Sequence, residues 1–338
     1  MRPTKTQPKT QAKTSNKLET QLADFHKTAK NIRGEIGKVV YGQEDVVEQT
    51  LITLFAGGHG LLVGVPGLAK TLLANTTATV MGLDGGRIQC TPDLMPADIL
   101  GAEVLEEDTK GKKSFRFIQG PVFCQLLMAD EINRASPRSQ SALLQAMQER
   151  IVSVAGTTHK LPEPFHVLAT QNPLEQEGTY PLPEAQLDRF MMQINVDYPT
   201  LEDERTMVLA TTSGDAPDLK AQMNGKDLMA AQALLKQVPV GEKVVEAIIG
   251  LVRRARPDGT DNLEVRENLA WGAGPRAGQT LLACVKVRAA MEGRLTPSVD
   301  DVVALAPAVL RHRMLPNFTA RAAGKTADDL IETLISDI

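Results

Sequence analysis

The sequence predicts an α/β protein in which an open parallel sheet, flanked by helices, is followed by an all-helical region. Over residues 39–199, apolar runs typical of buried parallel strands alternate with segments of helical periodicity. After Pro199 the helical periodicity continues, but no strong β-branched run follows. We therefore expect a flexible basic tail over residues 1–17, an α/β domain over 18–200 and a helical domain over 201–338.

The composition is that of an ordinary globular protein and argues against a nucleic-acid ligand. With 338 residues, 42% hydrophobic and 23% charged, the chain can bury the cores of about two domains. A net charge of −4 and a pI near 5.8 provide no electrostatic attraction for nucleic acid. The 4% of aromatic residues also leave little surface for base stacking.

No segment has the pattern of a membrane anchor, a disulfide framework or a metal site. No apolar run approaches the roughly 18 residues of a membrane span, and the basic N-terminus lacks an apolar signal region. Cys90, Cys124 and Cys284 lie far apart without a CxxC pair, and the histidines show no metal-ligand spacing. These features predict a cytoplasmic protein with reduced cysteines and no membrane insertion.

The N-terminal 17 residues carry basic side chains and no acidic one, spaced among Thr, Gln and Pro. Such a segment cannot bury enough apolar surface to fold alone, and it is either a solvated end or a contact for an acidic partner or nucleic acid. From Leu18 onward, apolar residues recur every three or four positions, which predicts a helix up to residue 36. A second helix is expected over residues 46–54.

A glycine-rich turn connects an apolar strand, residues 60–63, to a helix that begins near Lys70-Thr71. This strand, loop and helix context is the one that a phosphate-binding P-loop requires. Backbone N–H groups and the helix dipole would hold an oligophosphate, Lys70 would reach the terminal phosphates, and the Thr71 hydroxyl would ligate Mg²⁺. The residues expected to contact the nucleotide are Gly64, Val65, Pro66, Gly67, Leu68, Ala69, Lys70, Thr71 and Leu72.

One position of the loop departs from the usual pattern, because Ala69 stands where glycine normally precedes the lysine. Alanine disfavours positive φ, so the P-loop interpretation requires ordinary helical geometry at Ala69. The motif alone also leaves open a strand that runs through a Gly/Pro turn into a core helix.

The remaining elements follow in order. Strands are expected over residues 87–90, 122–128, 165–170 and 191–196, and helices over 137–148 and 184–190. Two hairpins are expected as insertions, one pairing residues 102–106 with 114–118 and the other pairing 150–154 with 159–161. The tip of the first hairpin carries Lys110, Lys112 and Lys113.

Polar residues follow two of the apolar strands, at the strand ends where open α/β sheets bind ligands. Asp130 would hold Mg²⁺ through its water shell, and Glu131 would orient or deprotonate an attacking water. Asn172 follows the next apolar strand and would lie beside this pair if the two strands are neighbours. Solvated carboxylates at a strand end and a simple Asn-Pro turn are the alternatives.

Four motifs in register carry a resemblance to a known family. They are Gly-Val-Pro-Gly-Leu-Ala-Lys-Thr at 64–71, Ala-Asp-Glu-Ile-Asn-Arg-Ala at 129–135, Ala-Thr-Gln-Asn-Pro at 169–173 and Leu-Pro-Glu-Ala-Gln-Leu-Asp-Arg-Phe at 182–190. Together they resemble the MoxR family of AAA+ ATPases over residues 38–200, and Gly-Pro-Arg-Ala at 274–277 extends the match to about residue 290. The loop with Ala69 is similar to the family's own form.

The resemblance implies a P-loop AAA+ module with a helical lid domain, and a homo-oligomeric ring, usually a hexamer, with ATP bound between subunits. Arg189 resembles the arginine finger that reaches the neighbouring subunit's γ-phosphate. Asn172 resembles sensor 1, and Arg276 resembles the lid residue called sensor 2, which would cover the site of its own chain. Val40, Tyr41 and Gly42 resemble the segment that contacts adenine.

The resemblance also implies a function, namely Mg²⁺-dependent ATP hydrolysis that remodels, assembles or activates a partner protein, as a chaperone does. The two hairpins resemble elements that face the ring's pore, and the family suggests a partner with a von Willebrand A domain. Two alternatives remain, a nucleic-acid-dependent motor and a nucleotide-gated scaffold with little turnover. A GTPase is disfavoured because the chain has no Asn-Lys-x-Asp motif.

Overall fold

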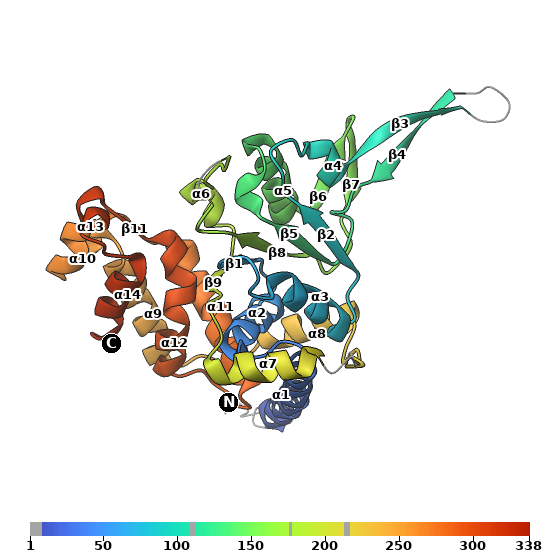
Figure 1. Cartoon of the computed structure of the whole chain (residues 1–338). Coiled ribbons are helices and arrows are strands. Elements are labelled where there is room, and N and C mark those ends of the chain that lie inside the picture. Colours follow the sequence, from blue (N-terminus) through green and yellow to red (C-terminus); the bar gives the residue numbers. More distant parts are fainter. Residues whose placement is uncertain (1–8, 108–112, 176–177, 213–216) are drawn as a thin grey trace, which may run out of the picture.

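A five-stranded parallel sheet forms the centre of the protein (Figure 1). The computed structural model describes residues 9–107, 113–175, 178–212 and 217–338; side chains are described from residue 17, except those of residues 211 and 212. The strand order is β2-β5-β8-β1-β9, and every neighbouring pair is parallel. The strands are β1 (Gly60–Val63), β2 (Gly85–Gln89), β5 (Leu126–Asp130), β8 (His166–Gln171) and β9 (Met192–Asn195).

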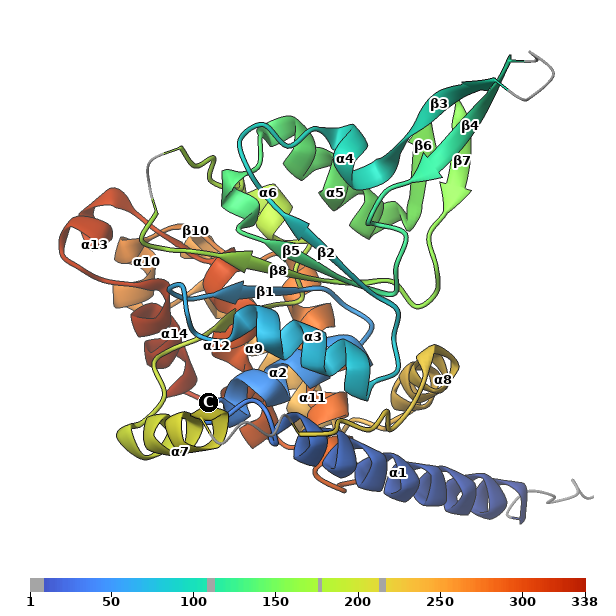
Figure 2. The same cartoon turned by 45° about the vertical axis from the view of Figure 1, so that its right-hand side comes forward.

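Both faces of this sheet are buried, as its apolar runs predict. Successive side chains of a strand point to opposite faces, so Leu61 joins one apolar cluster and Leu62 joins the other. The helices on the first face are α1 (Lys9–Ile36), α2 (Glu44–Phe55) and α3 (Lys70–Val80). The opposite face is covered by α4 (Pro96–Leu100), α5 (Pro137–Glu149) and α6 (Glu184–Leu187), as Figure 2 shows, and by η1 (Ile132–Arg134).

Two hairpins extend from the sheet on the side of α4 and α5, and both confirm the sequence prediction. One joins β3 (Gly101–Glu107) to β4 (Lys113–Gln119), and the other joins β6 (Ile151–Val154) to β7 (Thr157–Lys160). The β3–β4 hairpin projects from the body (Figure 1), and Lys113 on it is exposed. Lys110 and Lys112 lie outside the described residues.

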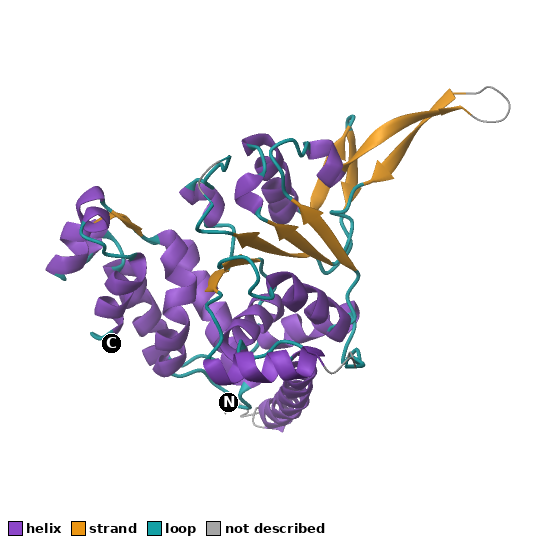
Figure 3. Cartoon of the chain, in the orientation of Figure 1, coloured by secondary structure: helices purple, strands orange, loops and turns teal. Residues whose placement is uncertain are grey.

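The C-terminal region is helical, as predicted, apart from one short antiparallel pair (Figure 3). That pair joins β10 (Leu269–Trp271) to β11 (Leu315–Pro316), segments too distant in sequence for local periodicity to reveal. The helices are α7 (Leu201–Thr212), α8 (Gly225–Leu235), α9 (Glu242–Arg254), η2 (Pro257–Gly259), α10 (Leu263–Asn268), α11 (Pro275–Met291), α12 (Val299–Leu310), η3 (Arg311–Arg313), α13 (Phe318–Ala322) and α14 (Ala327–Ile335).

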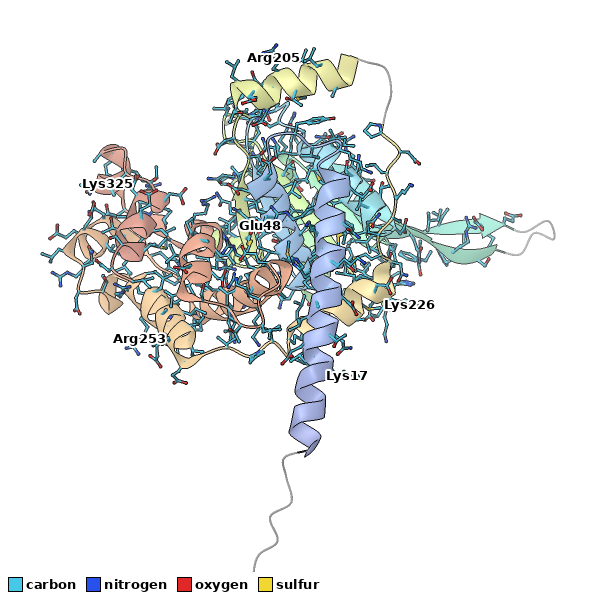
Figure 4. The ribbon with its side chains drawn as sticks, turned by 90° about the horizontal axis from the view of Figure 1, so that it is seen from below. Lys17, Glu48, Arg205, Lys226, Arg253 and Lys325 are labelled. Carbon is cyan, nitrogen blue, oxygen red and sulfur yellow. The ribbon has the colours of Figure 1, made fainter. Side chains whose placement is uncertain are left out.

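The helical region packs directly on the sheet domain. Helix α12 lies against β9, the edge strand, and α11 lies against α1 and α2. A partly buried ion network reinforces this junction: Arg288 of α11 donates to Asp301 of α12 at 2.7 Å and to Glu48 of α2 at 3.1 Å. Figure 4 labels Glu48 near the centre of the molecule. The position of α11 and α12 is therefore coupled to the sheet domain.

Three boundaries differ from the sequence predictions by three residues or more. Helix α6 ends at Leu187 rather than at residue 190. Helix α1 begins at Lys9 rather than Leu18, and its N-terminal half projects beyond the body, where Figure 4 labels Lys17. Once the apolar residues after Leu18 have formed a helix, extending that helix by one residue costs little free energy, and residues 9–17 contain no proline that would end it. Strand β5 begins at Leu126 rather than at residue 122, because residues 121–125 form a turn whose apolar residues, Val122 and Cys124 buried among them, periodicity does not separate from a strand.

No helix within the described ranges is long and apolar enough to cross a membrane.

Candidate functional site

A cavity of about 410 Å³ opens at the carboxyl ends of the central strands. It brings together the loop after β1 and the polar residues that follow β5 and β8, as the sequence predicts for an open parallel sheet. Gly64 and Val65 lie in the turn that leads to it and do not line it. The residues that line it are Pro66, Gly67, Leu68, Ala69, Lys70, Thr71, Leu72, Arg87, Gln89, Asp130, Glu131, Thr170 and Asn172.

Two glycines allow the loop to take its course. A Cβ on Gly64 would lie 2.4 Å from the carbonyl oxygen of Val196, so no larger residue fits beneath the loop. Gly67 has a φ of +87°, and a Cβ there would meet no atom within 4 Å, because this part of the loop faces the open cavity. The loop backbone is therefore free to approach a phosphate closely.

The expectation that Ala69 has helical geometry is wrong. Ala69 is the N-cap of α3 and lies in the left-handed region, with φ 54° and ψ 18°, because the chain turns sharply between the loop and the helix. This conformation costs an L-residue about 1–2 kcal/mol, which glycine would avoid. The loop forms with this local strain.

Lys70 folds over the loop that precedes it. Its ammonium group donates to the carbonyl oxygens of Gly64, at 2.7 Å, and Val65, at 2.6 Å. Partial burial lowers the pKa of Lys70, and the nearby carboxylates of Asp130 and Glu131 oppose that shift. Lys70 therefore provides positive charge at the wall of the cavity, opposite two carboxylates.

Asp130 is held by three neighbours at the end of β5. Its Oδ2 accepts from the Thr71 hydroxyl at 3.1 Å and from Arg87, through Nε at 3.1 Å and an Nη at 2.9 Å. Its Oδ1 accepts from the Thr170 hydroxyl at 2.8 Å. Thr71 and Asp130 thus place hydroxyl and carboxylate oxygens side by side, the hard oxygen ligands that suit Mg²⁺. This donor set fits the metal, although Arg87 occupies part of the Asp130 carboxylate.

Glu131 stands just after the strand and lines the cavity. Its backbone is left-handed, with φ 53° and ψ 51°, and its N–H donates to Thr170 Oγ1 at 2.8 Å. Its Oε2 accepts from Gln89 at 3.0 Å and from Arg134 at 3.1 Å. The carboxylate is therefore fixed in orientation by residues from β2 and η1.

Asn172 lies in the same wall, because β5 and β8 are neighbours. Its side chain is buried, and its carbonyl oxygen accepts from the N–H of Leu174 at 3.1 Å. That bond leaves the amide N–H groups of Asn172 available toward the cavity. The strands that precede Asp130 and Asn172 are thus neighbours, as the prediction for Asn172 required.

Val40, Tyr41 and Gly42 are not among the residues that line this cavity. The Tyr41 hydroxyl donates to the Lys38 carbonyl at 2.8 Å, and a Cβ on Gly42 would lie 2.5 Å from the Cβ of Asp203. This segment therefore packs beside the start of α7, and the structure does not bring it to the cavity wall.

Arg189 and Arg276 lie together in a second cavity of about 310 Å³. Arg189 donates to the Leu144 carbonyl at 2.7 Å, and an Arg276 nitrogen lies 3.5 Å from Asp188 Oδ2. The prediction that Arg276 covers its own chain's P-loop is not met here. Arg276 stands in the first turn of α11, which faces the segment after α6, so the Asp188 carboxylate is its partner.

Comparisons with known proteins agree with this arrangement. Residues 59–192 match the ATPase family associated with various cellular activities (AAA), and residues 262–334 match the AAA lid domain. Chaperone MoxR1 of Mycobacterium tuberculosis is 40% identical over 305 residues, which are 90% of this chain and 80% of that protein. The chain belongs to the MoxR family of AAA+ ATPases.

Further relatives extend the match over nearly the whole chain. Protein MoxR of Methylorubrum extorquens is 30% identical over 339 residues, which cover 95% of this chain and 97% of that protein. A crystal structure of a protein from Cytophaga hutchinsonii, described provisionally as an ATPase, has a TM-score of 0.87 at 38% identity. That match covers 97% of this chain and 98% of the other. The α/β domain and the helical lid are thus both those of a MoxR protein.

Four residues at or beside the cavity of this MoxR chain were not predicted from the sequence: three line it, and one contacts Glu131 from outside. Thr170 could have been found, since it is a polar residue that follows the apolar run Val167-Leu168-Ala169 and precedes Gln171-Asn172. Two more contact the carboxylates only because β2 lies beside β5, which no local pattern reveals, and the last is a local contact three residues after Glu131. They are Arg87, Gln89 and Arg134.

Proposed function

We propose that this MoxR protein hydrolyses ATP with Mg²⁺, and that it does so in a ring in which neighbouring subunits share each ATP site. The observation that carries the proposal is the single cavity in which the P-loop, Lys70 and Thr71 face Asp130 and Glu131. Phosphate-binding amides, a cation, a metal-ligand pair and a candidate base therefore lie within one space.

Each residue has a role that its position supports. The loop amides and Lys70 bind the phosphates, while Thr71 and Asp130 would hold Mg²⁺, which would supply charge stabilisation when bound. Glu131, oriented by Gln89 and Arg134, orients the attacking water and accepts its proton. Asn172 donates its amide N–H groups to the γ-phosphate or to that water.

The same geometry supports a site that is shared between subunits. Arg189 lines a different cavity from the P-loop, so its guanidinium serves an ATP site only if a second copy presents its own P-loop there. Repetition of such a head-to-tail contact closes a ring when the rotation permits. The hexamer implied by the family resemblance is one such ring.

The proposed use of the hydrolysis energy is to remodel or assemble a partner protein. Chaperone MoxR1 is a chaperone by name. The β3–β4 hairpin projects from the body and exposes apolar side chains on both strands, which suits contact with another protein. These side chains are Val104, Leu105, Phe115 and Ile118. The family resemblance favours a partner with a von Willebrand A domain.

The substitution Glu131→Gln tests the catalytic proposal. The variant should bind ATP with Mg²⁺ as tightly as the wild type, because the phosphate and metal ligands remain, yet its turnover should fall by about 10²–10⁴-fold. Turnover is measured by phosphate release and binding by calorimetry, each with Mg²⁺ and with a chelator. Unchanged turnover in the variant, or wild-type turnover in the chelator, would contradict the proposal.

A further inference from the structure

The segment that carries Arg189 is held by the lid domain through a buried arginine. Arg313 of η3 has a side chain that is only 3% exposed, and its Nε donates to Asp188 Oδ1 at 2.7 Å. The same guanidinium donates to the carbonyl oxygens of Phe190, at 2.7 Å, and Met191, at 3.2 Å. Arg313 therefore binds the backbone on the C-terminal side of Arg189 and the side chain of the residue before it.

Other lid residues extend the same contact. A ring nitrogen of His312 lies 3.0 Å from the Phe190 carbonyl oxygen, which makes that nitrogen the donor. Arg276 of α11 lies 3.5 Å from the second carboxylate oxygen of Asp188. Asp188 thus receives two arginines of the lid, one on each oxygen, and it is covalently joined to Arg189. We call Asp188, Arg276 and Arg313 the lid clamp.

We propose that Asp188 is a positioning residue for Arg189, so that the lid of one subunit sets the placement of the arginine finger offered to the next subunit. The inference rests on the proposed shared ATP site and goes beyond it by naming what controls the finger. A buried guanidinium stays paired with its carboxylate because separation would leave a charge without compensation. Movement of η3 therefore carries the Asp188–Arg189 segment with it.

The clamp is separate from the P-loop cavity of its own chain. None of its three residues is among those that line that cavity, and Lys70, Thr71 and Asp130 make no hydrogen bond to them within the described residues. Asp188 should therefore affect the chemical step at the neighbouring site without affecting ATP binding at its own.

The first test is the substitution Asp188→Asn, which keeps the side-chain shape and removes the charge. Turnover should fall by about 10²-fold, the effect of a misplaced catalytic group, while the affinity for ATP with Mg²⁺ stays within twofold of wild type. Arg276→Ala is the second variant: its side chain is 57% exposed, so the fold tolerates its loss, and it should show the same pattern with a smaller fall. In either variant, a loss of ATP affinity as large as the loss of turnover would overturn the inference.

A matched control removes a lid carboxylate that does not touch the finger segment. Glu264 pairs with Lys325 at 2.8 Å, and Figure 4 labels Lys325 at the outer part of the lid. Glu264→Gln should retain wild-type turnover. A fall equal to that of Asp188→Asn would show that any lost ion pair of the lid slows the enzyme, and it would overturn the specific role of the clamp.

Mixed rings show on which site Asp188 acts. Asp188→Asn mixed with Glu131→Gln should regain about a quarter of wild-type turnover, because at random one interface in four joins an intact pocket to a well-placed finger. Asp188→Asn mixed with Arg189→Ala should regain nothing, since neither subunit offers a working finger. Recovery only in the mixture with Arg189→Ala, or in neither mixture, would overturn the inference. If Asp188→Asn does not fold, Arg276→Ala replaces it in both mixtures.

A reference mixture separates this inference from the proposed function. Glu131→Gln mixed with Arg189→Ala tests the shared site without involving the clamp. If the reference mixture recovers activity and the Asp188→Asn mixture does not, only the role of the clamp is wrong. If the reference mixture stays inactive, the proposal of a shared site is wrong, and the proposed role of the clamp is wrong as well.

Discussion

The P-loop cavity and the cavity that holds Arg189 are built in different ways. The P-loop cavity is formed within the α/β domain, by the ends of neighbouring strands and one loop. The Arg189 cavity lies where the α/β domain meets the lid, and the lid residues Arg276 and Arg313 belong to its wall. The first site therefore depends on local strand geometry and the second on how two domains pack. A nucleotide-dependent change in that packing would alter the second site first.

The substitution with the largest expected effect disrupts the Arg189 site and leaves the P-loop cavity intact. Arg189→Ala should lower turnover in the assembled ring by about 10³–10⁵-fold, because it removes a cation that stabilises the transition state. ATP affinity should stay near wild type, since Arg189 lies outside the P-loop cavity. Phosphate release and ATP binding on the same assembled sample are the measurements. A variant that hydrolyses normally would show that the site is complete in one chain.

The substitution with the next largest expected effect disrupts the P-loop cavity. Lys70→Ala removes the cation that faces the phosphates, so ATP affinity should fall by about 10²-fold, the loss of a charge-assisted contact. Calorimetric titration with ATP and Mg²⁺ gives this value. Mixed with Arg189→Ala, the Lys70→Ala chain should still donate a working finger. Unchanged ATP affinity in Lys70→Ala would show that Lys70 does not bind the phosphates.

The sequence predicted the P-loop cavity better than the Arg189 cavity, and the reason is physical. Lys70, Thr71, Asp130 and Glu131 lie at the ends of apolar strands, where a single strand pattern already predicts their place. The contact of Asn172 with the same wall needed one further fact, the β5–β8 pairing.

The Arg189 cavity depends on contacts between distant parts of the chain. Arg313 reaches Asp188 across 125 residues, and no local periodicity indicates that pairing. Arg276 was predicted from the family resemblance to cover its own P-loop, and the structure places it beside Asp188 instead. Ala69 differs for a local reason, since the backbone needs a left-handed residue where the sequence has alanine.

The two regions should also differ in their response to acid. His59 lines the Arg189 cavity and the ring of His166 lies 6.3 Å from that of His59; burial lowers the pKa of His59 to about 3 and that of His166 to about 4. Above pH 6.5 both residues are neutral in the folded and unfolded chain, so their stabilising contribution is complete. As the pH falls from 6.5 toward 4, the unfolded chain takes up protons that the folded chain does not, and stability is lost.

This loss should be roughly 2 kcal/mol per histidine between pH 7 and pH 5. Urea denaturation at the two pH values measures it. The variant His166→Gln should be less stable at pH 7, because it loses the bond from His166 to the Gly58 carbonyl, yet it should lose less stability on acidification. An equal loss in both proteins would show that His166 is not responsible.

The smallest effect concerns strain in the P-loop. Ala69→Gly should raise the free energy of unfolding by about 1 kcal/mol, because glycine adopts the left-handed conformation without the steric cost of a Cβ. Urea denaturation at pH 7 is the measurement, and Gly67→Ala, at a second positive φ, should be destabilised by a similar amount. A stability loss in Ala69→Gly would contradict the left-handed geometry of Ala69.

The most direct test of the account is the turnover of Glu131→Gln and Arg189→Ala mixed in equal amounts. Each variant alone lacks one half of the site, and each supplies the half that the other lacks. If the two cavities of neighbouring subunits form one ATP site, random mixing should restore about a quarter of wild-type turnover. A mixture no more active than its two components would show that the P-loop cavity and Arg189 do not belong to one site.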